Sequence, residues 1–489
     1  MSSGEASSRP LFQRSSQPPS QPPSQLPARS VVITSSAPAP FDVWECGQIV
    51  LRSSRGTDFF VYPLFLHVAS SVVKRESPIL KTSDGIPLIT VYELDDNGME
   101  AFLKIIYPFP NPPLVGITQI LSVLKVGKDY CIDAVRLHAK EALHTLLGVD
   151  GYRVFAYSCI MGMEEEAQAA ADVILSNLLW AAPQLHYISD MAMISAGVYH
   201  RLLTFLSKDS TVPPDQRFLL TIGDQQLSVV AQAEAHDVNT YLDPATLERH
   251  PADVVICSMS KPFRTFPVHK NTLSMASDVL AKKIAGLPQC TLPSLPVLSL
   301  PENVDVVQLL LDFSYGVAIF YGLTTGDASG IPLLVKVARA AVAYAMPRLI
   351  AALKNVVKHL HVSEPLDAYI MAVECGWEAE ARKAALAIIS DPKTPKFPYS
   401  CSLEAARAKS YHRLLKFRAD VQVVVKNVMW ISYSPYSFGS SRPAAALPPE
   451  QPPRTLYGVE VTKVLTPEKM LELVDAVEAA VGKVGLEFD

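Results

Sequence analysis

The sequence lacks most of the short motifs that mark nucleotide-dependent, metal-dependent or hydrolytic enzymes. Its seven cysteines are widely scattered, and no two have the C-x-x-C spacing of a zinc knuckle or a redox pair. It contains no G-x-G-x-x-G, no G-x-x-x-x-G-K-[ST], no G-x-S-x-G and no H-E-x-x-H. We therefore predict that the protein is not an enzyme and uses no cofactor or metal.

Charge and long apolar runs are also scarce. Only 19% of the 489 residues are charged, and 43 basic against 48 acidic residues give a net charge of -5. No basic cluster exceeds doublets such as Lys74-Arg75, whereas nucleic-acid binding needs a concentrated positive surface. No apolar run reaches the roughly 18 residues of a membrane span, and the N-terminus has no signal-peptide layout. We expect an intracellular protein, cytoplasmic or nuclear, that binds neither nucleic acid nor membrane.

Proline, in contrast, is abundant at the two ends of the chain. Residues 1–40 are mostly Ser, Pro and Gln, which predicts a disordered tail, with a ligand for SH3 or WW domains as the alternative. Residues 419–465 are predicted to be a flexible segment because of the Ser/Pro-rich stretch that they include. Thr466-Pro467 then opens a predicted C-terminal helix over 466–485. Its apolar stripe either packs on its own chain or docks a partner.

One stretch, residues 253–277, organises the second half of the chain. Val254 to Cys257 alternates as a strand, a proline turn follows, and Phe266 to Val268 alternates again as the returning strand. A short helical face begins at Leu273, and Ser277 can cap the helix after it. A strand followed by a hairpin return and a helix is the predicted local structure.

The same series of elements occurs about 207 positions earlier in the chain. Residues 49–70 predict a strand, a turn at Gly56, a returning strand and a short helix. A further strand and a helix follow in both halves, and the helical regions after them match at an offset of 214. The five residues Tyr199–Leu203 are identical to Tyr411–Leu415. The sequence therefore predicts an α+β fold of two duplicated modules, each a small mixed sheet with helices, followed by an α-helical extension.

The repeats define the predicted domain boundaries. In chain order the predicted parts are a tail at 1–40, a first domain at 41–150, a first helical extension at 151–206, a linker at 207–249, a second domain at 250–360, a second extension at 361–418, a flexible segment at 419–465 and a C-terminal helix at 466–485.

The organising stretch resembles the BTB/POZ domain. The family pattern is an acidic residue that opens a strand, a hairpin that ends aromatic-x-Val-His-Lys/Arg, and then Leu-x-x-Ala-Ser. Eight residues of the second half match it: Asp253, Phe266, Val268, His269, Lys270, Leu273, Ala276 and Ser277. The first half departs from it, with Gln48 in place of the acid, Tyr62 in place of the histidine and Pro63 in place of the basic residue. The chain is similar in particular to the BTB proteins of mushroom-forming fungi that carry a helical extension.

This resemblance implies a platform for protein contacts. BTB domains dimerise, so we expect a non-enzymatic interaction protein that uses its BTB-like units for dimerisation or scaffolding. The units pair with other chains or with each other, and internal pairing predicts a monomer in solution. The alternative is a substrate adaptor that binds a cullin scaffold of a ubiquitin ligase.

The resemblance also suggests interface residues. It implies a charged patch of Asp253 and Lys270 beside His269, with Gln48 and Tyr62 at the corresponding places in the first half. The simpler alternative is that Asp253 only caps the start of its strand and Lys270 is solvated.

Other polar groups predict structural roles. We expect Cys131, Cys257 and Cys375 to be buried, and Glu164–Glu166 to form the solvated start of a helix. At i, i+2 on a helix, the rings of His359 and His361 diverge and cannot share a metal ion. The repeated His200 and His412 predict packing and not catalysis.

Overall fold

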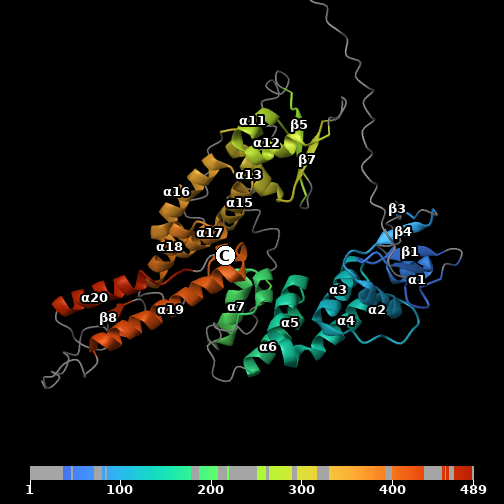
Figure 1. The fold of residues 1–489 in the computed structure, drawn as a ribbon, viewed down its shortest axis with the longest axis horizontal. Coiled ribbons are helices and arrows are strands. Elements are labelled where there is room, and N and C mark those ends of the chain that lie inside the picture. The colour runs from blue at the N-terminus through green and yellow to red at the C-terminus, as the bar shows by residue number, and fades with distance from the viewer. Residues whose placement is uncertain are drawn as a thin grey trace, which may run out of the picture. The chain divides into compact units, whose positions relative to one another are not determined.

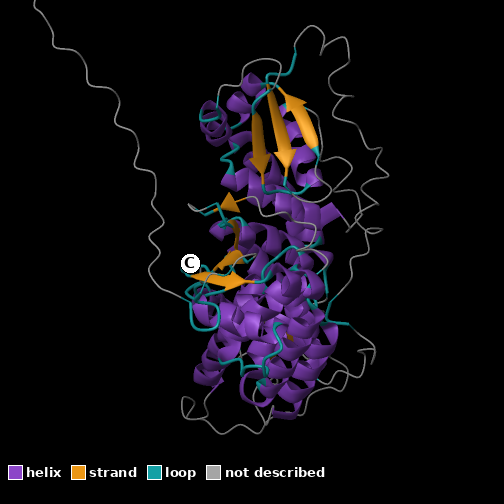
Figure 2. Cartoon of the chain, turned by 90° about the vertical axis from the view of Figure 1, so that its right-hand side faces the viewer, coloured by secondary structure: helices purple, strands orange, loops and turns teal. Residues whose placement is uncertain are grey.

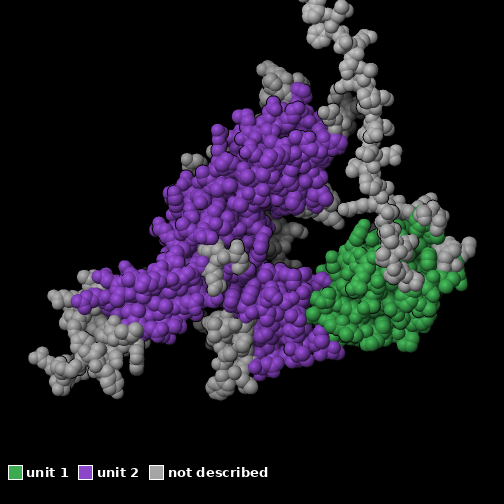
Figure 3. Space-filling model, in the orientation of Figure 1, with its two compact units in different colours: residues 1–142 green, residues 143–489 purple. Residues whose placement is uncertain are grey.

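The computed structural model has a mixed α+β fold that is mostly helical (Figure 1). The described residues are 37–43, 45, 48–70, 80–82, 85–177, 187–207, 217–219, 251–259, 264–288, 295–316, 330–390, 399–433, 454–456, 459–461 and 467–486. The chain divides into two compact units, residues 1–142 and 143–489 (Figure 3). The predicted N-terminal tail lies outside the described residues as far as position 36, as does most of the predicted linker.

The first unit contains a four-stranded mixed sheet. Its strands are β1 (Ile49–Arg52), β2 (Asp58–Val61), β3 (Leu80–Lys81) and β4 (Pro87–Thr90), in the order β2-β1-β4-β3. β1 pairs antiparallel with β2 and parallel with β4. The predicted turn between β1 and β2 uses Gly56 at φ 90°, a left-handed backbone that glycine adopts without steric cost.

Four helices among the described residues accompany this sheet. They are α1 (Pro63–Ala69), α2 (Asp96–Ile106), α3 (Gly116–Asp129) and α4 (Asp133–Thr145), the last of which crosses the boundary between the units. Asp95 caps α2, because its carboxylate accepts the N–H of Gly98 at 2.8 Å. Met99, Phe102 and Leu103 are buried at helical spacing and form the apolar face of this helix.

The second unit contains a three-stranded mixed sheet. Its strands are β5 (Val254–Ser258), β6 (Thr265–Val268) and β7 (Val297–Leu300), in the order β6-β5-β7. β5 pairs antiparallel with β6 and parallel with β7, and the strands lie side by side with helices behind them (Figure 2). Val254 and Ile256 are buried, whereas Val255 and Cys257, which alternate with them, are half-buried. This confirms the predicted alternation.

Between β5 and Tyr433, the described residues of this unit contain eight helices. They are α11 (Lys270–Ala276), α12 (Asp278–Ala285), α13 (Val304–Ser314), α15 (Ile331–Ala343), α16 (Pro347–Ser363), α17 (Pro365–Glu374), α18 (Glu378–Ser390) and α19 (Ala408–Tyr433). Ser277 caps α12 as predicted, since its hydroxyl accepts the N–H of Leu280 at 3.0 Å. Asn303 caps α13 through the N–H of Val306, also at 3.0 Å.

The first helical extension also belongs to the second unit. It consists of α5 (Leu147–Met161), α6 (Glu164–Asn177), the 3-10 helix η2 (Ser189–Met193) and α7 (Ala196–Leu206). In the second extension, η5 (Cys401–Glu404) precedes α19 as η2 precedes α7. Gly162 ends α5 and Gly376 follows α17, both in the left-handed region at φ 71° and 69°. Glycine adopts this backbone without steric cost, which suits it to the end of a helix.

Corresponding serines make the same contact in both sheet-containing regions. Ser70 Oγ donates a hydrogen bond to the carbonyl of Tyr130, and Ser277 Oγ donates to the carbonyl of Tyr344. Each serine ends the helix after the hairpin, and each tyrosine follows the helix that leads into the extension. The bond therefore ties a short helix to a distant one at matching places.

The helices that carry the repeated pentapeptide pack against each other through an antiparallel backbone bridge. Ala196 N–H donates to the carbonyl of Ala406 at 2.8 Å, and Ala408 N–H donates to the carbonyl of Ile194 at 3.0 Å. The two donor residues are 212 positions apart in the sequence, and so are the two acceptor residues. The entry into α7 and the entry into α19 are thus related by a local pseudo-two-fold axis.

Aromatic side chains obey the same pseudo-symmetry around this bridge. Six rings are involved: Tyr187, Tyr199, His200, Tyr399, Tyr411 and His412. Tyr187 stacks on His412 with ring centroids 4.2 Å apart, and Tyr399 lies 5.9 Å from His200 at the corresponding positions. Both histidines thus pack within the chain, which is the structural use that the sequence predicts.

A buried ion pair crosses the junction between α7 and α19. Arg201, whose side chain is 3% exposed, pairs with Glu404 and donates through Nε to the carbonyl of Phe218 at 2.9 Å. Ser195 Oγ donates to the same carboxylate at 3.1 Å. A buried charge is costly without a partner, so each member depends on the other. Ala192 stands at the position corresponding to Glu404, so the pair occurs on one side of the pseudo-two-fold axis.

Glu164, Glu165 and Glu166 start α6 as predicted, but only Glu165 is exposed, so the prediction that they form a solvated face is wrong in part. Glu164 accepts the backbone N–H groups of Phe218 at 2.7 Å and Leu219 at 2.8 Å, and Glu166 is buried. The cause is the segment 217–219, which returns to the start of α6 and finds in Glu164 an acceptor for its backbone donors. Phe218 itself is buried against Phe155, with ring centroids 5.1 Å apart.

The predicted flexible segment at 419–465 is also wrong in part. α19 continues to Tyr433, and β8 (Arg454–Leu456) pairs antiparallel with β9 (Val459–Val461). The helix continues because Val421 and Val425, one turn apart, are fully buried. Residues 434–453 lie outside the described part of the chain.

The C-terminal helix is present as α20 (Pro467–Val481), within the predicted range. Leu473, Val477 and Val481 are buried, and α20 packs on α19. Arg382 donates to the carbonyls of Gly482 at 2.8 Å and Val484 at 2.5 Å. The apolar stripe therefore packs on its own chain, the first of the two alternatives.

Gly197 provides a test of the junction. A β-carbon at this position would lie 1.9 Å from a carboxylate oxygen of Glu404. Gly197→Ala must therefore displace Glu404 from buried Arg201, which we expect to destabilise the junction by about 3 kcal/mol. Amide hydrogen exchange in α7 and α19 should then become about 100-fold faster.

Gly148→Ala is the matched control, because no atom lies within 4 Å of the added β-carbon. We expect this variant to exchange as the unaltered chain does. Equal exchange rates in α7 for both variants would contradict the close packing of Gly197 against Glu404.

Candidate functional site

Asp253 and Lys270 lie together at the start of α11. The Asp253 carboxylate accepts the backbone N–H of Lys270 at 2.6 Å, and its second oxygen is 3.9 Å from Lys270 Nζ. The side chains are 37% and 58% exposed, so the ion pair is solvated and contributes less than about 1 kcal/mol. The backbone hydrogen bond makes Asp253 a cap for the first turn of α11. Their role in an interface stays a prediction.

His269 is tied to the end of α13 by a tyrosine that the sequence did not single out. Its backbone N–H donates to the hydroxyl of Tyr315 at 2.9 Å, and its Nδ1 is 3.0 Å from the same oxygen. In the first unit the N–H of Tyr62 donates to the hydroxyl of Tyr107 at 2.8 Å. Burial raises the pKa of both acceptor tyrosines, which stay neutral. The two tyrosines stand at matching places, at the ends of α2 and α13. This match was the signal in the sequence from which their common role could have been predicted.

The two first-half residues of the predicted interface differ in accessibility. Gln48 is 6% exposed, and its side-chain oxygen accepts the N–H of Glu45 at 2.7 Å. Tyr62 is exposed, and its hydroxyl donates to the Glu45 carboxylate. Gln48 is thus a buried structural group, whereas Tyr62 lies at the surface beside the first residue of α1.

The surface of α1 is apolar. Leu64 is 67% exposed and Val68 is 79% exposed, and exposed His67 lies between them at helical spacing. We call Leu64, His67 and Val68 the α1 outer face. The helix has an apolar residue at nearly every position, and only Leu66 among them is buried. The single buried face of the helix is too narrow to bury all of these side chains. This excess of apolar residues is the signal in the sequence that indicates an exposed apolar face.

The corresponding face of α11 is more polar. Asn271 and Ser274 replace Leu64 and His67, while Met275, which is 84% exposed, replaces Val68. The two short helices therefore occupy matching places after their hairpins but expose different chemistry.

Two of the five described cysteines are buried and unreactive. Cys159 and Cys375 are buried, and burial raises the pKa of the Cys375 thiol to about 12, so the thiol stays protonated. The prediction that Cys131 is buried is wrong, because this residue lies in the turn between α3 and α4 at φ 53° and is exposed. Cys257 is half-buried. Among the described residues no group of His, Cys, Asp and Glu is arranged to hold a metal ion.

Substitution at the start of α11 separates the cap from the ion pair. We expect Asp253→Ala to destabilise this region by about 1 kcal/mol, because it leaves the N–H of Lys270 without its acceptor. Asp253→Asn keeps an oxygen at that place and should cost less, and Lys270→Met should change stability by less than about 0.5 kcal/mol.

Urea denaturation followed by circular dichroism measures these differences. If Lys270→Met destabilised the protein as much as Asp253→Ala, the ion pair and not the cap would be the important contact.

Comparison with known proteins adds no assignment. No family model matches this sequence, and no curated protein matches it. In the part of the chain that the structure describes, no helix combines the length and apolarity needed to cross a membrane.

Proposed function

We propose that this chain is a non-enzymatic protein-interaction protein made of two duplicated BTB-like modules, each followed by a helical extension. The common order and directions of strands β2-β1-β4 and β6-β5-β7 support the duplication. Ser70 and Ser277 make equivalent hydrogen bonds in the two halves, and so do Tyr107 and Tyr315, which supports the duplication further. The family itself rests on the sequence pattern around His269.

The exposed α1 outer face carries the proposal of an interaction surface. Leu64 and Val68 are mostly exposed on a helix whose buried face is already occupied by Leu66. Burial of one such aliphatic side chain contributes about 1.5–3 kcal/mol. In a two-fold symmetric contact each residue is buried once in each chain, so its gain counts twice per dimer.

The partner that fits this face best is a second copy of the chain. The matching face of α11 presents Asn271 and Ser274, so the two modules of one chain do not offer complementary apolar faces. Two α1 outer faces do match, because an isologous contact places the same apolar residues on both sides. The pseudo-two-fold contact of α7 with α19 is a precedent for such pairing of equivalent helices.

Light scattering after size-exclusion chromatography tests the proposal. At micromolar concentration we expect a dimer mass for the unaltered chain and a monomer mass for the double variant Leu64→Asp/Val68→Asp, since two buried carboxylates per helix cannot be accommodated. Met275→Asp is the matched control at the corresponding place on α11, and it should leave the dimer intact.

A monomer mass for the unaltered chain would contradict self-association and favour internal pairing of the modules. Dissociation by Met275→Asp and not by the α1 variant would move the contact to α11. The adaptor alternative predicts a different result, namely co-precipitation of a cullin that the α1 substitutions do not affect.

A further inference from the structure

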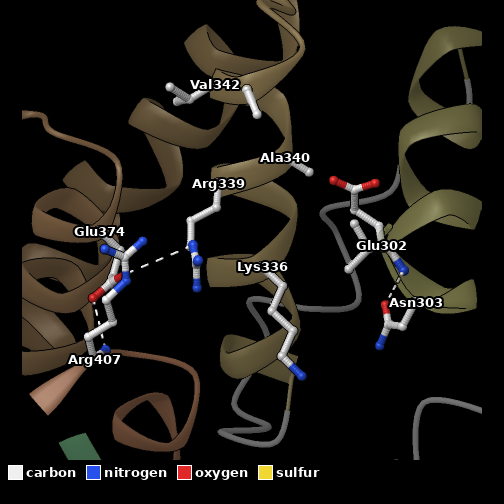
Figure 4. A pocket seen from close by; sticks show the side chains of 10 residues that line it. Glu302, Asn303, Lys336, Arg339, Ala340, Val342, Glu374 and Arg407 are labelled. Carbon is white, nitrogen blue, oxygen red and sulfur yellow. Dashed lines mark hydrogen bonds and ion pairs between the residues drawn. The ribbon is translucent and has the colours of Figure 1, made fainter. Parts of the chain in front are cut away.

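A cavity of about 520 Å³ lies in the second unit, whereas the proposed interaction surface belongs to α1 of the first unit. It is formed by the first turn of α13, by α15, by the end of α17 and by the residue before α19 (Figure 4). Its volume lies within the range of small-molecule sites in proteins. Five charged side chains line it: Glu302, Lys336, Arg339, Glu374 and Arg407.

Glu374 holds two guanidinium groups near one another without hydrogen bonding to either. Its side chain is 2% exposed, and one oxygen accepts the N–H of Arg407 at 3.0 Å and the hydroxyl of Ser410 at 2.6 Å. The other oxygen lies 3.9 Å from Nε of Arg339 and 3.9 Å from Nε of Arg407. The two Nε atoms are therefore no more than twice that distance, 7.8 Å, apart. Both guanidinium groups are within reach of a single phosphate.

The donors of both guanidinium groups remain available. Arg339 and Arg407 are 40% and 61% exposed, and neither side chain donates a hydrogen bond to the described residues. Lys336 lies one turn before Arg339, is exposed, and has no ion pair with any described residue. Lys336 and Arg339 project from the same side of α15 in Figure 4. Three cationic groups thus border one cavity, and none of them uses its side-chain donors in a hydrogen bond to a described residue.

The opposite wall of the cavity provides an acceptor. Glu302 accepts the hydroxyl of Tyr344 at 2.6 Å through one carboxylate oxygen. Its other oxygen can accept a hydrogen bond from a ligand, and a carboxylate there favours a neutral hydroxyl over a second anion.

The repeated fold does not require these charges. The positions that correspond to Lys336, Arg339, Glu374 and Arg407 are Ser122, Lys125, Ile160 and Ser195. The single base retained there, Lys125, is paired with Glu93 at 3.4 Å. The cluster is therefore a feature of the second copy alone and is not part of the framework that the two copies share.

We propose that this cavity binds a small phosphate monoester that carries hydroxyl groups, with the phosphate on Lys336, Arg339 and Arg407. Three cations and two carboxylates line the cavity, a net charge of +1, and this excess of cations favours an anion such as a phosphate monoester, which carries about -1.5 to -2 at neutral pH. Planar guanidinium groups match phosphate oxygens geometrically. A hydroxyl of the ligand donates to Glu302.

Isothermal titration calorimetry with glucose 6-phosphate, inorganic phosphate and glucose tests the site on the full chain. We expect glucose 6-phosphate to bind more tightly than inorganic phosphate, and glucose not to bind. Arg339→Met and Lys336→Met should each weaken binding at least tenfold. Lys125→Met, at the position corresponding to Arg339, should leave it unchanged. Glu302→Gln should reduce the preference for the ester over inorganic phosphate.

Circular dichroism of each variant checks that it is folded before titration. Absence of binding by the folded, unaltered chain at millimolar glucose 6-phosphate would overturn the proposal. Equal weakening by Lys125→Met and Arg339→Met would also overturn it, because the binding would then be non-specific attraction to surface charge.

Discussion

The buried ion pair between Arg201 and Glu404, with the backbone bridge beside it, is the contact on which the second unit depends. It joins segments about 200 residues apart, and a guanidinium that is 3% exposed cannot lose its carboxylate without leaving a charge unpaired. Because of this contact, the first helical extension packs on the second half of the chain. The compact units consequently divide at Ala142 and Leu143, within α4, and not between the two sequence repeats. The domain boundaries predicted from the sequence follow the repeats and not these compact units, and they remain predictions.

Pairing of equivalent helices within one chain frees each copy to change alone. In a dimer of identical chains, a substitution appears on both sides of the two-fold axis, whereas in a duplicated chain it appears once. Glu404, which pairs with Arg201, corresponds to Ala192 in the other copy, which has no charge. The same asymmetry separates the apolar α1 outer face from the more polar face of α11, and the charged cluster near Glu374 from its counterpart, which keeps only Lys125. We infer that the two proposed modules share a framework and differ in what they bind.

Local patterns were enough to predict the elements of this fold. Alternation identified β5 and residue type identified the cap Ser277, because each signal lies within a few residues of its effect. The candidate site was predictable only in part, since Asp253 and Lys270 do meet but Gln48 is buried. Contacts between distant segments could not be predicted: nothing near Glu164 indicates that Phe218 returns to it, and nothing near Arg201 indicates Glu404. The full extent of α19 was not predicted, because the polar composition after Ser432 outweighed the buried valines before it.

Disulfide trapping across the α7–α19 junction is the most direct test of this internal pairing. Ser195 and Arg407 face each other in the antiparallel bridge as a non-hydrogen-bonded pair, for which the Cα atoms are about 4.5 Å apart, a distance that a disulfide can span. The double variant Ser195→Cys/Arg407→Cys should therefore form a disulfide under mild oxidation. Mass spectrometry should find the two peptides linked in protein that runs at the monomer position without reductant. Absence of this link, or a link found only between chains, would contradict the pairing of α7 with α19 within one chain.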